Sequence, residues 1–269
     1  MTISPSDTLE ILERLAVQAG AEIMAVRAQN FEVAEKSDGS PVTIADQRAE
    51  AVVVAGLLKS FPRVPIVAEE MVAAGDVPSA LGVQFFLVDA LDGTKEFCAG
   101  REEFTVNIAL VDGGVPVAGV IYCPCARMLF AGAHNGQGNG AAHQRKVSES
   151  GEIGKAETLN VRDYATPPVI IATRSHMTPQ TEAWLKSIPA AELRTIGSSL
   201  KFCEVAAGNA DLYPRFGTTM EWDTAAGDAI LRAAGGSTKT EDGKPLAYGK
   251  RGQEGMADFQ NPFFVSRGR

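Results

Sequence analysis

Residues 88–97 combine two carboxylates with a small polar turn, an arrangement that suits the binding of a metal ion and a phosphate group. Asp89 and Asp92 lie three residues apart at the end of an apolar run, and Gly93-Thr94 follows directly. Carboxylate oxygens are the ligands that Mg²⁺ prefers, and backbone N–H groups of such a turn can approach phosphate oxygens. Taken alone, the same spacing also occurs in ordinary polar turns, since Asp and Gly favour turns for conformational reasons.

Two more acidic groups stand at the ends of expected elements. Glu69-Glu70 closes a short β-prone run, and Asp223 lies at the expected start of a helix that continues to about residue 234. An Asp at a helix start has a structural explanation, because it caps the helix and complements the helix dipole. The same explanation applies to Asp46, so local sequence alone selects neither residue as functional.

Taken together, three motifs resemble the metal-binding motifs of the inositol-monophosphatase superfamily of Mg²⁺-dependent, Li⁺-sensitive phosphatases. In chain order they are Glu69-Glu70, Asp89-Ala-Leu-Asp92-Gly93-Thr94 and Trp222-Asp223-Thr-Ala-Ala-Gly227. Further similar segments, found nearly from end to end, are residues 36–46, 104–109, 174–176, 197–203 and 212–216. The last three resemble one branch in particular, the bacterial CysQ-type 3'(2'),5'-bisphosphate nucleotidases. Ala90 stands where that pattern has Pro, a difference that removes no ligand side chain.

The resemblance implies a set of metal ligands. One Mg²⁺ is expected on Glu69, Asp89 and the carbonyl of Leu91, and a second on Asp89, Asp92 and Asp223. Glu69 is expected to reach a weaker third ion through water, which makes two to three ions per active site. Asp89 would then bridge the first two ions.

The resemblance also implies catalytic roles. Thr94 is expected to orient the nucleophilic water, with Asp46 as its hydrogen-bond partner and proton acceptor. Glu70 is expected to support these catalytic groups without binding a metal directly.

Substrate contacts follow from the same resemblance. Gly93, Thr94 and Lys36 are expected near the scissile phosphate, where Asp223 would contact substrate as well as metal. The base, the ribose or the second phosphate of a nucleotide is expected to meet His176, Ser198, Lys201 and Arg215. Without the resemblance, surface solvation would explain these cations equally well.

The implied activity is the hydrolysis of adenosine 3',5'-bisphosphate to AMP and phosphate by in-line attack of an activated water, without a covalent phosphoenzyme. One alternative is the same chemistry on inositol monophosphate or a sugar phosphate. Another is a non-catalytic protein that senses a nucleotide and a metal ion. A serine hydrolase and a P-loop NTPase are both disfavoured, because the chain has neither a Gly-x-Ser-x-Gly elbow with plausible partners nor a Gly-x-x-x-x-Gly-Lys-Ser/Thr loop.

Composition limits the class of protein. The net charge of −8 disfavours a binder of nucleic-acid polymers, which needs a basic surface. Four cysteines without a Cys-x-x-Cys pair disfavour a disulfide framework and suit a reduced cytoplasm, although a zinc or redox module on Cys123 and Cys125 is a further alternative. No apolar stretch is long enough to span a bilayer, so we expect a cytoplasmic protein, with peripheral membrane association and a homodimer left open.

Hydrophobic periodicity predicts the elements that must position these residues. Helices are expected over residues 7–28 and 44–61, followed by mostly antiparallel strands over residues 66–68, 84–88, 105–111, 115–122 and 128–133. Beyond residue 156 we expect a strand over 169–172, helices over 179–187 and 198–207, a strand over 210–215 and the helix after Asp223. His134 and His143 are expected in solvent-facing turns. These elements fit an α/β (α+β) fold, the layered αβαβα sandwich that the resemblance implies, with an N-terminal α+β domain (1–156) carrying the metal motifs and a C-terminal α/β domain (157–269) carrying the substrate-binding residues.

Overall fold

The computed structural model describes residues 3–36, 39–136, 140–173, 177–188 and 190–269. Its helices are α1 (Pro5–Arg27), α2 (Ile44–Ser60), α3 (Glu69–Ala73), α4 (Thr94–Cys98), α5 (Pro179–Lys186), α6 (Leu200–Ala206) and α7 (Glu221–Ala233). Its strands are β1 (Val33–Glu35), β2 (Pro41–Thr43), β3 (Ile66–Ala68), β4 (Gln84–Asp92), β5 (Thr105–Asp112), β6 (Val115–Cys123), β7 (Met128–His134), β8 (Gly140–Lys146), β9 (Glu157–Leu159), β10 (Val169–Thr173), β11 (Glu192–Ile196), β12 (Leu212–Arg215), β13 (Ser237–Thr240) and β14 (Phe264–Arg267).

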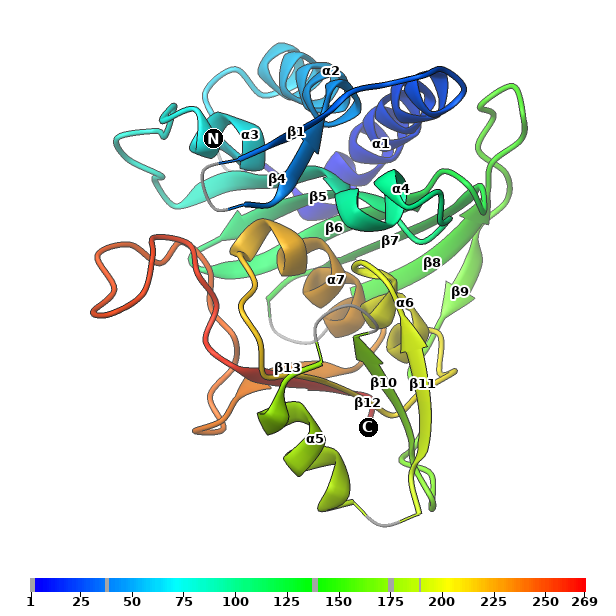
Figure 1. Ribbon diagram of the computed structural model, residues 1–269. Coiled ribbons are helices and arrows are strands. Elements are labelled where there is room, and N and C mark those ends of the chain that lie inside the picture. Colours follow the sequence, from blue (N-terminus) through cyan, green and yellow to red (C-terminus); the bar gives the residue numbers. More distant parts are fainter. Residues whose placement is uncertain (1–2, 37–38, 137–139, 174–176, 189) are drawn as a thin grey trace.

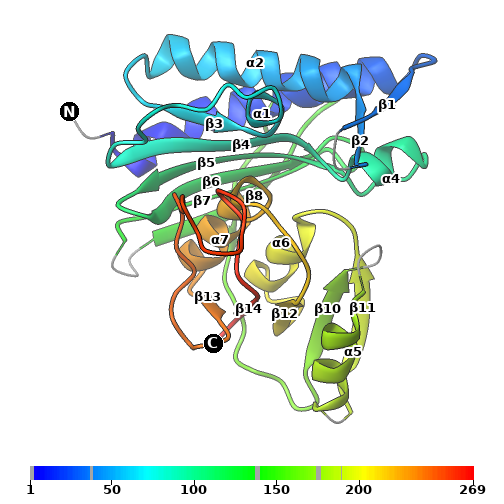
Figure 2. The same cartoon turned by 60° about the vertical axis from the view of Figure 1, so that its left-hand side comes forward.

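Helices and sheets alternate in five layers, as Figures 1 and 2 show. Helices α1 and α2 cover one face of a seven-stranded sheet, and α7 packs on the opposite face with α6 beside it. A five-stranded sheet lies beyond α6 and α7, and α5 lies on its far side. This arrangement confirms the predicted αβαβα sandwich.

The larger sheet has the order β3-β4-β5-β6-β7-β8-β9 and is antiparallel except for the β3–β4 pair. The smaller sheet has the order β11-β10-β12-β14-β13, with parallel pairing of β10 to both β11 and β12. Because helices cover both faces of the larger sheet, nearly every residue of β4, β5 and β6 is buried.

The two long N-terminal helices and the strands β3 to β7 lie where hydrophobic periodicity predicts them. Other elements escaped prediction because their sequences lack a clear period. The polar segment before α2 forms the β1–β2 hairpin, and the segment between β7 and the expected domain limit at residue 156 contains β8. The proposed division at residue 156 stays a prediction; the larger sheet extends slightly beyond it, since Leu159 of β9 pairs with Ala142 of β8.

The prediction of solvent-facing turns for two histidines is wrong, because β7 and β8 extend through them. His134 ends β7 and is buried, with its Nε2 2.8 Å from the carbonyl oxygen of Pro116. His143 lies within β8, where its Nε2 is 2.6 Å from Oε1 of the buried Glu13. Both imidazoles thus serve the packing of the sheet and α1.

Small residues in α7 allow this helix to approach its neighbours closely. A Cβ atom on Gly227 would lie 2.4 Å from the ring of Phe202 in α6. On the other side, a Cβ on Gly119 of β6 would lie 2.4 Å from the carbonyl oxygen of Ala226. The Ala-Ala-Gly sequence after Asp223 therefore has a packing reason, and it fixes the position of the helix that carries this carboxylate.

Candidate active site

A cleft of about 680 Å³ opens where the ends of β4, α6, β12 and α7 meet. The predicted site residues that line it are Lys36, Glu69, Asp89, Leu91, Asp92, Gly93, Thr94, Ser198, Lys201, Arg215 and Asp223. The cleft thus brings together side chains from the first 95 residues and from the last third of the chain. His176 lies outside the described residues, as does Arg174.

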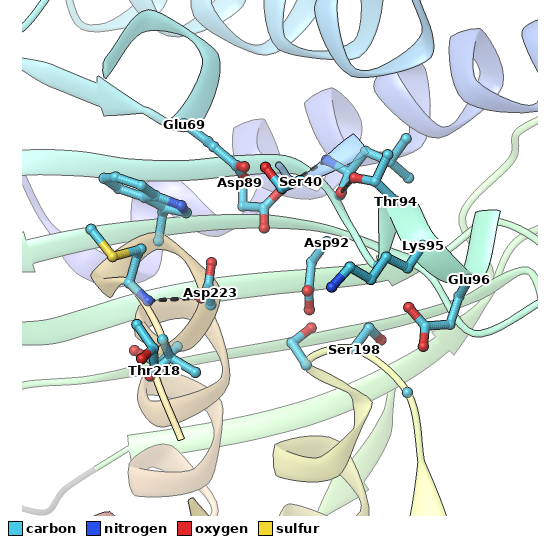
Figure 3. Close-up of a pocket in the computed structure, with 18 of the residues that line it drawn as sticks. Ser40, Glu69, Asp89, Asp92, Thr94, Lys95, Glu96, Ser198, Thr218 and Asp223 are labelled. Atoms are coloured by element: carbon cyan, nitrogen blue, oxygen red, sulfur yellow. Dashed lines mark hydrogen bonds between the residues drawn. The ribbon is translucent and has the colours of Figure 1, made fainter. Parts of the chain in front are cut away.

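An irregularity in β4 directs two of the carboxylates to the same side. Asp89 pairs with Asn107 and Asp92 pairs with Thr105, so three steps along β4 match two steps along β5. In a regular strand, residues three apart point to opposite faces; the extra residue of this bulge restores a common face. Figure 3 shows Asp89 and Asp92 on the cleft side of the strand.

The turn after β4 requires a glycine. Gly93 adopts φ 96°, and a Cβ there would lie 3.0 Å from the carbonyl oxygen of Glu103. Only glycine adopts this backbone conformation without strain and tolerates the close approach. The turn places Thr94 at the start of α4, facing the cleft.

Three carboxylates converge in the cleft. Oxygen atoms of Glu69, Asp89 and Asp223 all lie within 4.8 Å of one another, and Asp92 lines the same wall. Burial together with the charges of Glu69, Asp92 and Asp223 raises the pKa of Asp89 well above its ordinary value. Burial and the neighbouring carboxylates raise the pKa of Asp223 in the same way. A cation between these groups would remove their mutual repulsion, and an all-oxygen donor set fits Mg²⁺.

Thr94 and Asp46 form a hydrogen-bonded pair at the edge of this cluster. The Thr94 hydroxyl can donate to Asp46 Oδ1 at 2.9 Å or to the Leu91 carbonyl at 3.1 Å. Asp46 is buried, and this burial raises its pKa although hydrogen bonds from Thr43 and Thr94 oppose the shift. A carboxylate with a raised pKa is suited to accept a proton.

The capping interpretation of Asp46 and Asp223 is also correct. Asp46 Oδ2 accepts hydrogen bonds from the backbone N–H and the hydroxyl of Thr43, at 2.7 and 2.8 Å, at the start of α2. Asp223 Oδ2 accepts the backbone N–H of Met220 at 2.8 Å at the start of α7. Because a carboxylate has two oxygens, one can cap a helix while the other faces the site. Capping therefore fixes the direction of both side chains.

Glu70 is not among the residues that line the cleft and belongs to a charged group around Lys36. Lys36 Nζ lies 2.6 Å from Oε1 of Glu69 and 2.6 Å from Oε1 of Glu70. Behind them the buried Glu50 accepts the backbone N–H groups of Glu70 and Met71, at 2.8 and 2.9 Å. Burial, with a contribution from Glu70, raises the pKa of Glu50 to about 7. Local sequence gave no signal for Glu50, which reads as an ordinary helical residue.

Two buried cations, Lys201 and Arg215, also line the cleft. Burial lowers the pKa of Lys201 to about 8, while the charge of Asp92 opposes this shift. Lys201 Nζ donates to the carbonyl oxygens of Ile196 and Ser198. Arg215 donates through Nη2 to the carbonyl of Thr218 at 2.9 Å, and its buried Nε has no hydrogen-bond partner among the described residues. These two cations suit an anionic group of a ligand.

A family model for the inositol monophosphatase family matches residues 4–260. This chain belongs to the inositol monophosphatase family. It is 42% identical over 253 residues to the 3'(2'),5'-bisphosphate nucleotidase CysQ of Escherichia coli K12, covering 93% of this chain and 96% of that one.

Solved structures agree with this assignment. The crystal structure of CysQ from Bacteroides thetaiotaomicron, described as a bacterial member of the inositol monophosphatase family, superposes with a TM-score of 0.77 at 36% identity and covers 96% of this chain and 97% of that one. The inositol monophosphatase of Thermotoga maritima, at 23% identity, shares the fold with a TM-score of 0.75 over 97% and 92% of the two chains. The family resemblance inferred from the sequence motifs is thus confirmed. Within the described residues, no helix has the length and apolarity needed to cross a bilayer.

Mg²⁺ should stabilise this family member through the three-carboxylate cluster. We expect saturating Mg²⁺ to raise the melting temperature by roughly 5–10 °C over EDTA, because a ligand at a hundred times its Kd contributes about 2.7 kcal/mol. Differential scanning fluorimetry measures this shift. Asp223→Asn should remove most of it, whereas Asp211→Asn, which changes a buried carboxylate bound to Arg162 outside the cleft, should retain it. An equal shift in wild type and Asp223→Asn would contradict the assignment.

Proposed function

We propose that this protein is a Mg²⁺-dependent phosphomonoesterase that hydrolyses adenosine 3',5'-bisphosphate to AMP and phosphate. The observation that carries the proposal is the convergence of three carboxylates beside the Thr94–Asp46 pair, in a cleft that Lys201 and Arg215 also line. The similarity to CysQ nucleotidases over nearly the whole chain supports the same substrate. A molecule with two phosphates suits a cleft that contains both a carboxylate cluster for metal ions and two further cations.

The proposed ligand set is the one that the family resemblance implies, and the convergence of Glu69, Asp89 and Asp223 supports part of it. Glu69, Asp89 and the Leu91 carbonyl would hold one Mg²⁺, and Asp89, Asp92 and Asp223 a second; a third ion reached from Glu69 through water belongs to the same proposal. When bound, Mg²⁺ neutralises phosphoryl charge and lowers the pKa of water.

The protein groups would orient the reactants and move a proton. With its hydrogen committed to Asp46 Oδ1, Thr94 Oγ1 has lone pairs left to accept a hydrogen bond from the attacking water. Asp46 would take up the proton that the water releases, through the Thr94 hydroxyl. Glu70 would support these groups indirectly by holding Lys36 next to Glu69. Gly93 and Lys36 would face the scissile phosphate. Ser198, Lys201 and Arg215 would contact the rest of the nucleotide.

A substrate panel tests the proposal. Phosphate release with Mg²⁺ should be measured for adenosine 3',5'-bisphosphate, its 5'-phosphosulfate analogue, inositol 1-phosphate and fructose 1,6-bisphosphate. We expect the highest kcat/KM for the adenosine bisphosphate. A higher value for inositol 1-phosphate or the sugar bisphosphate would favour the alternative phosphatases of the same family. Binding without turnover of any member would favour a sensor, an alternative that the intact Thr94–Asp46 pair disfavours.

A zinc or redox module is disfavoured by the geometry of the cysteines. Cys123 ends β6 and is buried, and its pKa is raised to about 11 by burial, whereas a reactive thiol needs a lowered pKa. The group of possible metal-binding side chains found in the described part of the chain contains carboxylates and no cysteine. A cytoplasmic location and a homodimer stay predictions.

Loss of Lys201 or Arg215 should selectively impair the hydrolysis of the nucleotide substrate. Lys201→Ala or Arg215→Ala should raise KM for adenosine 3',5'-bisphosphate and lower kcat/KM by about ten- to a hundredfold, since a charge-assisted hydrogen bond is worth roughly 1.5–3 kcal/mol. Turnover of a simple phosphomonoester and the affinity for Mg²⁺ should hardly change. Steady-state kinetics on both substrates measure the difference.

Arg194→Ala is the matched control, because this arginine is an exposed cation of the same half that pairs with Glu192 outside the cleft. It should leave both substrates unaffected. Equal losses on the bisphosphate and on an inositol phosphate in Lys201→Ala and Arg215→Ala would assign the two cations a general role and weaken the nucleotide assignment.

A further inference from the structure

A chain of buried hydroxyl and amide groups connects β5 to the start of α6 behind the wall of the cleft. Thr105 Oγ1 lies 2.8 Å from Ser199 Oγ, and Ser199 Oγ donates to Asn107 Oδ1 over 2.7 Å. Thr105 and Asn107 are fully buried and Ser199 is 3% exposed. Of the three, only Ser199 lines the cleft. Ninety-two residues separate Ser199 from Asn107, so this contact joins distant parts of the chain.

The hydrogen bonds of this chain have one consistent direction. A serine hydroxyl has a single hydrogen, which Ser199 gives to Asn107, so Thr105 must donate to Ser199. The amide of Asn107 is thereby oriented, with Oδ1 toward Ser199 and Nδ2 away from it. This Nδ2 is buried and makes no hydrogen bond of normal geometry to the described residues, but it is close enough to Asp92 to act on that carboxylate as a donor.

The register of β4 and β5 places these hydrogen-bonded side chains directly beside the carboxylates. Asn107 is paired with Asp89, and Thr105 is paired with Asp92. Paired residues of an antiparallel ladder point to the same face of the sheet. Asn107 and Thr105 therefore lie next to the two carboxylates, on the same face of the sheet.

The hydroxyl of Ser199 bonds to β5 instead of capping α6. It is the N-cap residue of α6, but its hydroxyl makes no capping hydrogen bond to the helix. A serine at this position usually accepts a backbone N–H of the first turn. Here the hydroxyl is committed to β5, two residues before Lys201 in α6. The start of α6 is thus held by the sheet that bears the carboxylates.

We propose that Asn107 and Ser199 are positioning residues that hold the start of α6 against β5, so that Asp92 of β4 and Lys201 of α6 keep a fixed separation. Neither residue needs to touch the substrate. Loss of the connection should impair the nucleotide end and the metal end of the cleft together. The substrate part of this inference rests on the proposed function; the metal part does not, because Mg²⁺ affinity can be measured without turnover.

Ser199→Ala tests the connection, and Ser266→Ala is its matched control. Ser266 is fully buried and lies in β14, outside the cleft. Like Ser199, it pairs with a threonine hydroxyl, which here is Oγ1 of Thr238 at 2.9 Å. We expect Ser199→Ala to raise KM for adenosine 3',5'-bisphosphate about tenfold, the equivalent of one lost hydrogen bond, and to raise the Mg²⁺ midpoint in a thermal-shift titration about threefold. Ser199→Thr, which keeps the hydroxyl, should remain within about twofold of wild type in both measurements.

Ser266→Ala should lower the metal-free melting temperature as much as Ser199→Ala does, while leaving KM and the Mg²⁺ midpoint within about twofold of wild type. If Ser199→Ala also lowered the melting temperature without changing KM or the Mg²⁺ midpoint, Ser199 would have only a structural role and the proposal would be wrong. Asn107→Leu gives a second test and should raise the Mg²⁺ midpoint about tenfold, since it removes the amide beside Asp92. An unchanged midpoint in that variant would also overturn the proposal. If wild type does not hydrolyse the bisphosphate, the proposed function fails, and the Mg²⁺ titrations still decide this inference.

Discussion

Asp89→Asn should abolish phosphatase activity while leaving the fold intact. Asp89 is 3% exposed and lies within 4.8 Å of the carboxylates of Glu69 and Asp223, where the proposed ligand set makes it the bridge between two ions. Its Oδ1 accepts the backbone N–H of Leu91 at 3.0 Å, a bond that the amide oxygen of Asn can preserve. The substitution therefore removes charge without removing the local structural contact. Turnover at saturating Mg²⁺ should fall below a tenth of wild type, a loss of at least about 1.4 kcal/mol in transition-state stabilisation.

Stability measurements separate this effect from unfolding. Without metal, the melting temperature of Asp89→Asn should be unchanged or raised, because one of several repelling carboxylates becomes neutral. The Mg²⁺-dependent rise in melting temperature should be lost. Asp112→Asn, on the neighbouring strand and outside the cleft, should keep both activity and the Mg²⁺ response. Turnover above a tenth of wild type in Asp89→Asn would refute the bridging role.

The sequence predicted which residues form the metal-binding motifs, but not the geometry that brings their side chains together. Asp89 and Asp92 are recognisable by type and order, but strict strand alternation would place residues three apart on opposite faces. Only the irregular β4–β5 pairing, which depends on both strands, turns the two carboxylates to one side. A single strand read in isolation does not contain this information.

Long-range partners were equally hidden. Glu50 reads as a polar helical residue until its contact with the backbone of Glu70, twenty residues away, is visible. From local sequence, Asn107 is interpreted as a residue inside a strand and Ser199 as a helix cap. Their hydrogen bond arises from the packing of α6 near the larger sheet, which no local pattern encodes.

Asp46 and Asp223 show why local and functional interpretations need not compete. Local sequence favoured capping for both, and the structure contains both capping bonds. The same helix starts direct the side chains to the cleft region, where Asp46 accepts from Thr94 and Asp223 joins Glu69 and Asp89. A helix start is therefore a precise support for a carboxylate, because the cap fixes its rotamer.

Thr94→Ala should lower kcat by roughly a hundred- to ten-thousandfold, the range typical of a proton-transferring group, while changing KM less than about threefold. Thr94 donates to Asp46 Oδ1 at 2.9 Å and would position water in the transition state without gripping the substrate in the ground state. Thr94→Ser keeps the hydroxyl and should retain most of the activity. Steady-state kinetics with adenosine 3',5'-bisphosphate give the split between kcat and KM.

Asp46→Asn should produce a similar loss for a related reason. Its amide oxygen can still accept the bonds from Thr43 that start α2, so the helix should persist, but the amide nitrogen placed toward Thr94 cannot accept its hydrogen or a proton. Since the two residues would act as one unit, the double variant should be little worse than either single variant, giving a coupling energy of about the size of one single loss. Circular dichroism and melting temperature check that each variant is folded. Fully additive losses in the cycle would show that Thr94 and Asp46 act independently, and the proton would then need an acceptor other than Asp46.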